Sequence, residues 1–307
     1  MPDTSADITY TLENLTDWSR SGPSLAVIGN PVRHSISPQM HNAAIAKLAE
    51  KDERFSNWKY FRFEIPAELL IESLPIFREK GFLGLNLTVP HKEIAVPATA
   101  EIDPLAKTIG AVNTLQKTEN GWKGFNTDGY GLAQGIKISL SKEIAHSDFV
   151  LLGAGGAARA AAIQAIHYGC ATLTIVNRNQ ERLGKLVNEL RPLAEKSGVE
   201  LRSLSPQSID ELHSDCLLVN ATSLGLKPDD PTPIPESKIP ENAYCFDMIY
   251  NPPTTKLMEI VRLKGGTTAN GLGMLVHQGA KALSIWTGQD APSEIMQEAA
   301  EAALAKH

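Results

Sequence analysis

The amino-acid sequence predicts an α/β fold made of two α/β units. Strand-like apolar runs alternate with helix-like segments through most of the 307 residues, as a layered α/β architecture requires. Chains of this length usually fold around more than one hydrophobic core, which favours two domains. A glycine-rich turn directly after the strand-like run at 148–152 indicates where the second unit builds its first βα connection.

The first 127 residues are predicted to form a βα-rich unit of their own. Its apolar runs and turn residues predict strands at 25–28, 58–63, 82–87, 111–116 and 121–124, and helices at 37–49 and 66–79. Ser37 is expected to cap the first helix, with Pro38 at its first position. Asn120-Gly121 between the last two strands is typical of a tight hairpin.

A helix from Asp128 to about Leu140 is predicted to lead into the second unit. There the sequence predicts strands at 148–152, 171–176, 216–220 and 244–248, and helices at 155–168, 179–190 and 254–264. The proline-rich stretch 228–240 is expected to be a loop. Two closing helices, at about 272–286 and 292–305, could pack on either unit.

Charge and composition narrow the functional class. The net charge is −6 with a pI near 5.8, so no general basic surface invites nucleic acid or an anionic membrane. Every apolar stretch is interrupted by a polar or charged residue before the roughly 18 residues that a membrane span needs. Residues 1–23 have neither the basic start nor the apolar centre of a signal peptide. The protein is therefore expected to be cytoplasmic.

Cysteine and histidine spacing argues against a metal centre. The three cysteines, Cys170, Cys216 and Cys245, are far apart and form no C-x-x-C pair, which favours buried thiols in a reducing compartment. The eight histidines show no metal-ligand spacing. We expect no bound metal.

A dinucleotide-binding motif follows the strand at 148–152. The motif residues are Gly153, Ala154, Gly155, Gly156 and Ala157. This G-x-G-x-x-A pattern permits a tight turn and close backbone approach, and the helix that follows presents free N–H groups to a pyrophosphate. On its own the pattern could be a glycine-rich turn. Its position between a buried strand and a helix favours a Rossmann-like, doubly wound cofactor domain.

The residues at the end of the next strand indicate which cofactor the protein binds. NAD-binding units place an acidic residue there to accept hydrogen bonds from the ribose hydroxyls. This chain has Asn177 and Arg178, with Arg182 four residues further on. Two guanidiniums can clamp a 2′-phosphate, although they are also compatible with a solvated helix start. We therefore predict NADP.

Other strand ends of the second unit carry candidate cofactor residues. Thr222 follows the strand at 216–220 and Met248 closes the strand at 244–248. Carboxyl ends of parallel strands form the ligand-binding edge of doubly wound sheets. Both residues are candidates for the cofactor pocket, with turn and core roles as the alternatives.

Polar residues also follow an apolar strand in the first unit. The run from Asn86 through Thr88 to Lys92 places an amide, a hydroxyl and an ammonium at a strand end. Such a group suits a hydroxylated, anionic small molecule. A fraying strand with a solvated lysine is the structural alternative. His91 is expected to have only a structural role.

Several motifs together resemble one enzyme family. They are the run Asn30 to Pro38 with its two serines, the run Asn86 to Lys92, Gly110 to Thr114, Gly124 to Gly129, and Asn270 to Ala280, together with the glycine motif and Asn177-Arg178. With these motifs in order along the sequence, over about residues 24–287, the chain closely resembles shikimate dehydrogenases. That family reversibly reduces 3-dehydroshikimate to shikimate with NADPH, on the route to chorismate and the aromatic amino acids.

The resemblance implies roles for individual residues. Ser35 and Ser37 would bind the substrate carboxylate, and Asn86, Thr88, Asn113 and Gln278 would hydrogen-bond the ring hydroxyls or the carboxylate. Tyr250 would lie near the nicotinamide and the carboxylate, and Gly271 would help to bind the cofactor. Lys92 and Asp128 would form the catalytic pair, although Asp128 also suits a helix N-cap. The protonation state of Lys92 stays open.

The resemblance also implies the domain plan. A substrate-binding domain would comprise residues 1–127 plus 271–307, and an inserted NADP-binding domain residues 128–270, with the active site in a cleft between them. The partner would be a small-molecule substrate, and the protein a monomer or a homodimer. The residues before the first strand have no assigned role, and Asn179 stands where the family often has Thr.

Three alternatives remain. One is a quinate/shikimate dehydrogenase that accepts NAD, although Ser37 favours shikimate. Another is a non-catalytic ligand sensor on the same fold, against which the intact Lys92 and Asp128 argue. A third is a different NADP oxidoreductase, such as a folate dehydrogenase, which would not need the Ser35/Ser37 pair.

Overall fold

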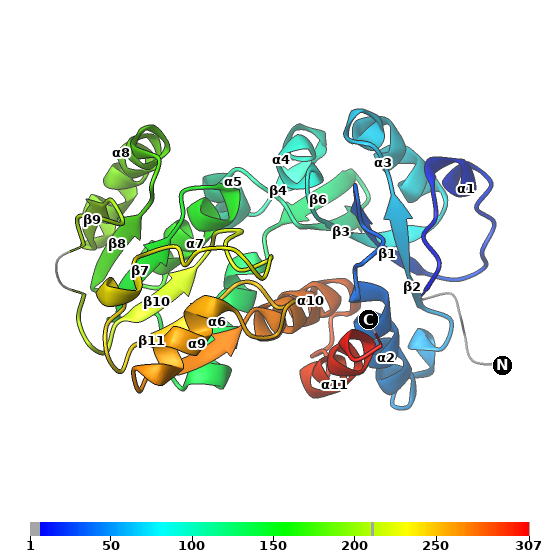
Figure 1. Cartoon of the computed structure of the whole chain (residues 1–307). Coiled ribbons are helices and arrows are strands. Elements are labelled where there is room, and N and C mark those ends of the chain that lie inside the picture. The colour runs from blue at the N-terminus through cyan, green and yellow to red at the C-terminus, as the bar shows by residue number, and fades with distance from the viewer. Residues whose placement is uncertain (1–6, 210–211, 307) are drawn as a thin grey trace. The chain divides into compact units, whose positions relative to one another are not determined.

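The structure is a computed structural model that describes residues 7–209 and 212–306. The chain divides into two compact units: unit 1 is Met1–Asp128 with Val276–His307, and unit 2 is Gly129–Leu275. Each unit contains its own six-stranded sheet with helices around it (Figure 1). The predicted α/β class is confirmed.

The sheet of unit 1 has the strand order β2-β1-β3-β5-β6-β4. Its strands are β1 Ser24–Gly29, β2 Lys59–Glu64, β3 Phe82–Leu87, β4 Glu101–Ile102, β5 Thr114–Thr118 and β6 Gly121–Phe125. β1 lies parallel to both β2 and β3, whereas β5 runs antiparallel to β3 and β6. Thr118 pairs with Gly121, so the predicted hairpin is confirmed. Its loop residues are Glu119 and Asn120, and Gly121 is already the first residue of β6.

The helices of unit 1 include two that pack side by side, α2 and α11 (Figure 1). The full set is α1 Leu12–Thr16, α2 Ser37–Ala49, α3 Leu70–Glu79, α4 His91–Ile94, α5 Pro104–Ile109 and α11 Ser293–Leu304, with short 3-10 turns at Glu53–Phe55, Ala67–Leu69 and Val96–Ala98. α10, Leu272–Thr287, begins in unit 2 and ends in unit 1. The predicted helix at 66–79 is thus a 3-10 turn followed by α3.

One helix-capping prediction is wrong. Ile36, not Ser37, is the N-cap of α2, and Ser37 is already inside the first turn. The Ser37 hydroxyl accepts a hydrogen bond from the Ser35 hydroxyl instead of capping a backbone N–H. This leaves both hydroxyls at the start of a 13-residue helix.

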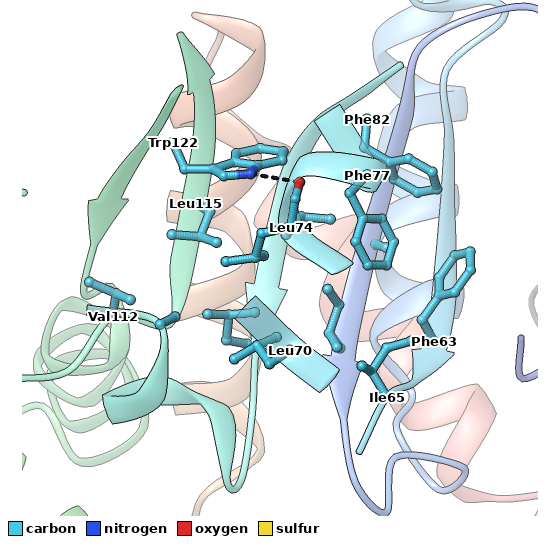
Figure 2. Packing of buried hydrophobic residues seen from close by; sticks show 14 of the residues in the cluster. Phe63, Ile65, Leu70, Leu74, Phe77, Phe82, Val112, Leu115 and Trp122 are labelled. Carbon is cyan, nitrogen blue, oxygen red and sulfur yellow. Dashed lines mark hydrogen bonds between the residues drawn. The ribbon is translucent and has the colours of Figure 1, made fainter. Parts of the chain in front are cut away.

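The core of unit 1 lies between the sheet and α3 and is rich in aromatic rings. Phe63, Phe77 and Phe82 meet edge to face, and Trp122 donates a hydrogen bond from Nε1 to the carbonyl of Leu74 at 3.0 Å (Figure 2). Edge-to-face contacts of this kind add stability beyond the area they bury. The aromatic packing fixes the sheet from which the polar motifs emerge.

The segment before β1 packs along the edge strand β2. Tyr10 donates its N–H to the carbonyl of Arg62 and accepts a hydrogen bond from the N–H of Glu64. The Trp18 ring lies 4.7 Å from the Phe61 ring, measured between centroids. The described part of the N-terminal segment therefore covers backbone groups that an edge strand would otherwise expose.

The sheet of unit 2 is entirely parallel, in the order β12-β11-β10-β7-β8-β9. Its strands are β7 Asp148–Leu152, β8 Thr172–Val176, β9 Glu200–Leu204, β10 Leu217–Asn220, β11 Tyr244–Asp247 and β12 Thr267–Asn270. The strand order reverses direction at β7, as in the doubly wound Rossmann arrangement. The edge strands β9 and β12 were not predicted, because their polar residues lack the apolar pattern of the central strands.

The helices of unit 2 follow the predicted order with one change of length. They are α6 Asp128–Leu140, α7 Gly156–His167, α8 Gln180–Ser197 and α9 Lys256–Leu263, with a 3-10 turn at Glu236–Lys238. α8 was expected to end near residue 190 but continues through Pro192 to Ser197, because its buried apolar stripe extends to Ala194.

In the part of the chain that the structure describes, no helix is both long enough and apolar enough to span a membrane.

Candidate active site

Two polar motifs of unit 1 follow neighbouring parallel strands. Ile28 pairs with Leu87 at the carboxyl ends of β1 and β3, and the N–H of Thr88 donates to the carbonyl of Ile28 at 2.9 Å. The loop with the two serines follows β1, and the run to Lys92 follows β3. Both motifs therefore begin at one edge of the same sheet, where parallel strands place ligand-binding groups.

Lys92 and Asp128 form an ion pair in unit 1. Lys92 Nζ lies 2.6 Å from Asp128 Oδ2, and the two side chains are 31% and 15% exposed. The other carboxylate oxygen, Oδ1, accepts a hydrogen bond from Asn113 Nδ2 at 2.9 Å. The carboxylate thus holds the ammonium from one side, while part of the lysine side chain stays open to solvent.

Asn113 connects this pair to Gln278 in α10. Its amide nitrogen donates to Thr127 Oγ1 at 3.0 Å and to Gln278 Oε1 at 3.3 Å. Its amide oxygen accepts from the backbone N–H of Thr127 at 2.8 Å. Asn113 is only 2% exposed, so this network fixes the orientation of Asp128 and Gln278 together.

Asn86 is also held by buried partners. Tyr60 donates its hydroxyl hydrogen to Asn86 Oδ1 at 2.8 Å, and Asn86 Nδ2 donates to Thr114 Oγ1 at 3.1 Å. Burial raises the pKa of Tyr60 well above its usual value, and a hydrogen bond with Ser37 opposes this. Tyr60 is therefore a neutral donor near physiological pH that connects the β3 motif to the serine loop.

The serine pair begins α2. Ser35 Oγ donates to Ser37 Oγ at 3.2 Å and accepts from the Ser37 N–H at 3.3 Å. A helix N-terminus carries a partial positive charge and free N–H groups. Two hydroxyls placed there are suited to a carboxylate.

His91 has the structural role expected from the sequence. It is fully buried, and its Nε2 lies 2.9 Å from the carbonyl oxygen of Ile65. Burial lowers the pKa of His91, which favours the neutral ring. By contrast, Thr88 and Lys92 on either side are only partly buried.

The glycine-rich loop of unit 2 connects β7 to α7. Gly153 has φ +119°, a conformation that other residues rarely adopt. A Cβ added at Gly155 would point into open space, and no side chain caps the N-terminus of α7. This open surface beside free helix N–H groups fits a pyrophosphate. Gly156, Ala154 and Ala157 complete the turn and the first residues of the helix.

The end of β8 has the features expected of an NADP site. Asn177 follows the strand, and Asn179 caps α8 by accepting from the N–H of Arg182 at 2.9 Å. Asn179 is thus the N-cap of α8. Arg178 and Arg182 are exposed, and neither forms an ion pair within residues 7–209 and 212–306. Their charges are available to a 2′-phosphate.

A buried carboxylate orders the ends of β10 and β11. Asp247 accepts hydrogen bonds from Asn220 Nδ2 at 3.0 Å and Thr255 Oγ1 at 2.7 Å. Asn220 Oδ1 in turn accepts from the Thr222 hydroxyl at 2.7 Å. Burial raises the pKa of Asp247, and these hydrogen bonds oppose the shift. The network fixes Thr222, one of the predicted cofactor residues.

Three further predicted residues lie near the end of β11. A Cβ added at Gly271 would come within 2.1 Å of the Met248 carbonyl oxygen, so only glycine allows this close approach. Tyr250 is partly exposed, and burial raises its pKa. Tyr250 belongs to unit 2, whereas the other predicted substrate residues belong to unit 1.

Sequence reasoning did not identify Thr127 or Tyr60 as residues of the network. Thr127 is 2% exposed and connects Asn113 with Gln278, and it lies inside a motif that the sequence does single out. Tyr60 offered no local signal, because its contact with Asn86 depends on strands that are distant in the sequence.

Comparison with known proteins assigns the family. Residues 27–115 match the family model described as the shikimate dehydrogenase substrate binding domain, and residues 271–301 match the shikimate 5'-dehydrogenase C-terminal domain. A curated shikimate dehydrogenase (NADP(+)) from Methanopyrus kandleri is 39% identical over 280 residues, covering 90% of this chain and 93% of that protein. The chain belongs to the shikimate dehydrogenase family.

Solved structures of related proteins have the same fold. Shikimate 5-dehydrogenase from Thermus thermophilus, in complex with NADP(H) and shikimate, is 35% identical with a TM-score of 0.78, covering 91% of this chain and 99% of that one. Quinate dehydrogenase from Corynebacterium glutamicum, in complex with NAD, is 26% identical with the same TM-score, covering 92% and 100%. Similar solved structures thus include proteins named for different substrates and solved with different cofactors.

Proposed function

We propose that this member of the shikimate dehydrogenase family reversibly reduces 3-dehydroshikimate to shikimate with NADPH, a step toward chorismate and the aromatic amino acids. The observation that carries the proposal is the Lys92–Asp128 pair at 2.6 Å, joined through Asn113 to Gln278. Unit 1, which also carries the serine pair, is the proposed substrate-binding domain. Unit 2 is the proposed NADP-binding domain.

In this proposal, different residues of unit 1 bind different groups of the substrate. Ser35 and Ser37 bind the carboxylate at the start of α2. Asn86 and Thr88 at the end of β3, with Asn113 and Gln278, hold the ring hydroxyls. Because Asn86 and Asn113 are already fixed by buried partners, little side-chain freedom is lost when the substrate binds.

Lys92 and Asp128 carry the proton chemistry. Reduction at the C3 carbonyl builds negative charge on its oxygen, which the Lys92 ammonium stabilises and then protonates. In the reverse direction the neutral lysine accepts the hydroxyl proton. Asp128 orients Lys92 through Oδ2, and its position is fixed by Asn113.

The residues of unit 2 fit NADP. The glycine loop at 153–157 and the N-terminus of α7 would hold the pyrophosphate, and Asn177, Arg178 and Arg182 the 2′-phosphate end. Thr222, Met248 and Gly271 follow the neighbouring strands β10, β11 and β12, and Tyr250 lies just beyond Met248. When bound, the cofactor supplies the hydride for reduction and takes it back in oxidation.

A direct assay tests the proposal. Purified protein is mixed with NADP⁺ and shikimate, and absorbance at 340 nm is followed; we expect reduction of NADP⁺ that requires both compounds. Quinate with NAD⁺ is the comparison, because a related structure is a quinate dehydrogenase in complex with NAD. Faster turnover of quinate with NAD⁺ would replace the proposal with that activity. No turnover of either acid would favour a ligand sensor.

A further inference from the structure

We infer that Arg62 is a positioning residue for the substrate carboxylate, because its guanidinium fastens the loop that carries Ser35 and Ser37. The inference rests on the proposed function. Arg62 lies on β2, the edge strand beside β1. It is 5% exposed, although arginine is rarely buried without a specific partner.

The guanidinium bonds two carbonyls of the serine loop. Nη1 of Arg62 donates to the carbonyl of Arg33 at 2.7 Å, and Nη2 donates to the carbonyl of Ser35 at 2.7 Å. The planar fork spans two acceptors that are two residues apart, which a single ammonium does less well. Arg62 therefore restricts the backbone from which the Ser35 hydroxyl extends.

The strand alternation explains why this side chain reaches the loop. Tyr60 and Arg62 share one face of β2, whereas Phe61 and Phe63 face the aromatic core. Tyr60 bonds Asn86 and interacts with Ser37. Two neighbouring side chains on one face of β2 thus support both serines and the β3 motif.

The N-terminal segment also interacts with Arg62. Thr9 Oγ1 accepts from Arg62 Nη1 at 3.4 Å, and Asp7 Oδ1 accepts from Gln39 in α2 at 3.1 Å. Burial lowers the pKa of Arg62, and the charge of Asp7 opposes this. The guanidinium stays charged, so a cation is bonded to the backbone of the loop whose hydroxyls are proposed to bind an anion.

The test compares Arg62→Gln and Arg62→Lys with Arg54→Gln, whose guanidinium is exposed and paired with Asp52. We expect Arg62→Gln to raise the KM for shikimate by at least 10-fold, with kcat and the KM for NADP⁺ changed less than 3-fold. Arg62→Lys should lie between the wild type and Arg62→Gln. Arg54→Gln should match the wild type.

Other outcomes are distinguishable. A wild-type protein without shikimate turnover contradicts the proposed function itself. An active Arg62→Gln variant with an unchanged KM for shikimate overturns the positioning role. A fall in kcat together with similar rises in both KM values and a lowered Tm would also overturn it, because these changes indicate general damage to the fold. If Arg62→Gln does not fold, Arg62→Lys alone decides by the same KM comparison.

Discussion

Asp128 contacts Lys92 and Asn113 through different carboxylate oxygens, with Oδ2 at 2.6 Å from Lys92 Nζ and Oδ1 at 2.9 Å from Asn113 Nδ2. The pair is thus part of a fixed network and differs from an ordinary surface ion pair, which contributes little to stability. Unit 1 offers such an ordinary pair for comparison, Lys123 with Glu101 at 3.3 Å.

Lys92→Ala should abolish most of the catalysis. Without the ammonium, charge on the C3 oxygen is not stabilised and no group protonates it, so we expect kcat to fall by on the order of 100-fold or more with KM changed little. The measurement is steady-state reduction of NADP⁺ by shikimate. Lys123→Ala is the matched control and should keep wild-type kinetics. Near-normal turnover by Lys92→Ala would remove the catalytic assignment.

Asp128→Asn should lower kcat by about 10-fold to 100-fold. The amide has nearly the same shape, but it carries no negative charge to pair with the Lys92 ammonium, so the hydrogen bond between them is weaker. Glu101→Gln, the matched change in the exposed pair, should leave kcat unchanged. If Asp128→Asn and Glu101→Gln behave alike in the same assay, Asp128 has no special role.

The double variant Arg178→Gln/Arg182→Gln should lose preference for NADP⁺. Hydrogen bonds to charged groups contribute about 1.5–3 kcal/mol each, so we expect the KM for NADP⁺ to rise by roughly 100-fold and that for NAD⁺ to change little. Arg191→Gln, on the exposed side of the same helix, is the control. A similar rise in the KM values for NADP⁺ and NAD⁺ would show that the two arginines do not bind the 2′-phosphate.

Gly155→Ala should weaken cofactor binding without changing the stability of the fold. The added methyl meets no protein atom within 4 Å, so the free energy of unfolding should stay within about 0.5 kcal/mol of the wild type. It would occupy the space proposed for the pyrophosphate, so the KM for NADP⁺ should rise about 10-fold or more. The two quantities are measured by urea unfolding and by initial rates.

Gly184→Ala is the control for that experiment. Gly184 is exposed within α8, and its added Cβ also meets nothing. It should stabilise the protein by about 0.5–1 kcal/mol through helix propensity and leave the kinetics unchanged. An unchanged KM in Gly155→Ala would count against the pyrophosphate site.

His41 makes stability depend on pH. Burial lowers its pKa to about 4, below the unfolded value of about 6.5. The unfolded chain therefore binds more protons between these two values, and stability falls as pH drops through that window. His41 alone should cost about 2 kcal/mol between pH 7 and pH 5.

Urea unfolding at the two pH values checks this. His41→Asn should reduce the pH-dependent loss, while His167→Gln, at an exposed position in α7, should not. A wild-type stability that is the same at pH 5 and pH 7 would contradict the expectation for His41.

Much of the fold could be predicted from the sequence because central strands are continuous apolar runs and helices have clear starts. β3 begins and ends at the predicted residues, Phe82 and Leu87. The edge strand β9 was missed because Glu200 and Arg202 on it are polar and at least partly exposed. Local pattern alone carries no signal for a strand whose position depends on pairing with β8.

The candidate site was predicted less completely. Motifs such as Asn86 to Lys92 identify residue types at strand ends, and the structure brings Lys92, Asn113, Asp128 and Gln278 together within unit 1. The roles of these residues stay predictions. The supports from Tyr60 and Arg62 could not be predicted, because both depend on contacts between β2 and segments that are distant in the sequence. Tyr60 contacts Asn86 on β3, and Arg62 contacts the serine loop.

Isotope transfer tests the central claim most directly. Shikimate carrying deuterium at C3 is incubated with NADP⁺ and the protein, and the reduced cofactor is analysed by mass spectrometry and NMR. The account predicts one deuterium at C4 of the nicotinamide, with Lys92→Ala forming the same product much more slowly. Reduced cofactor without deuterium, or no reduction at all, would contradict it.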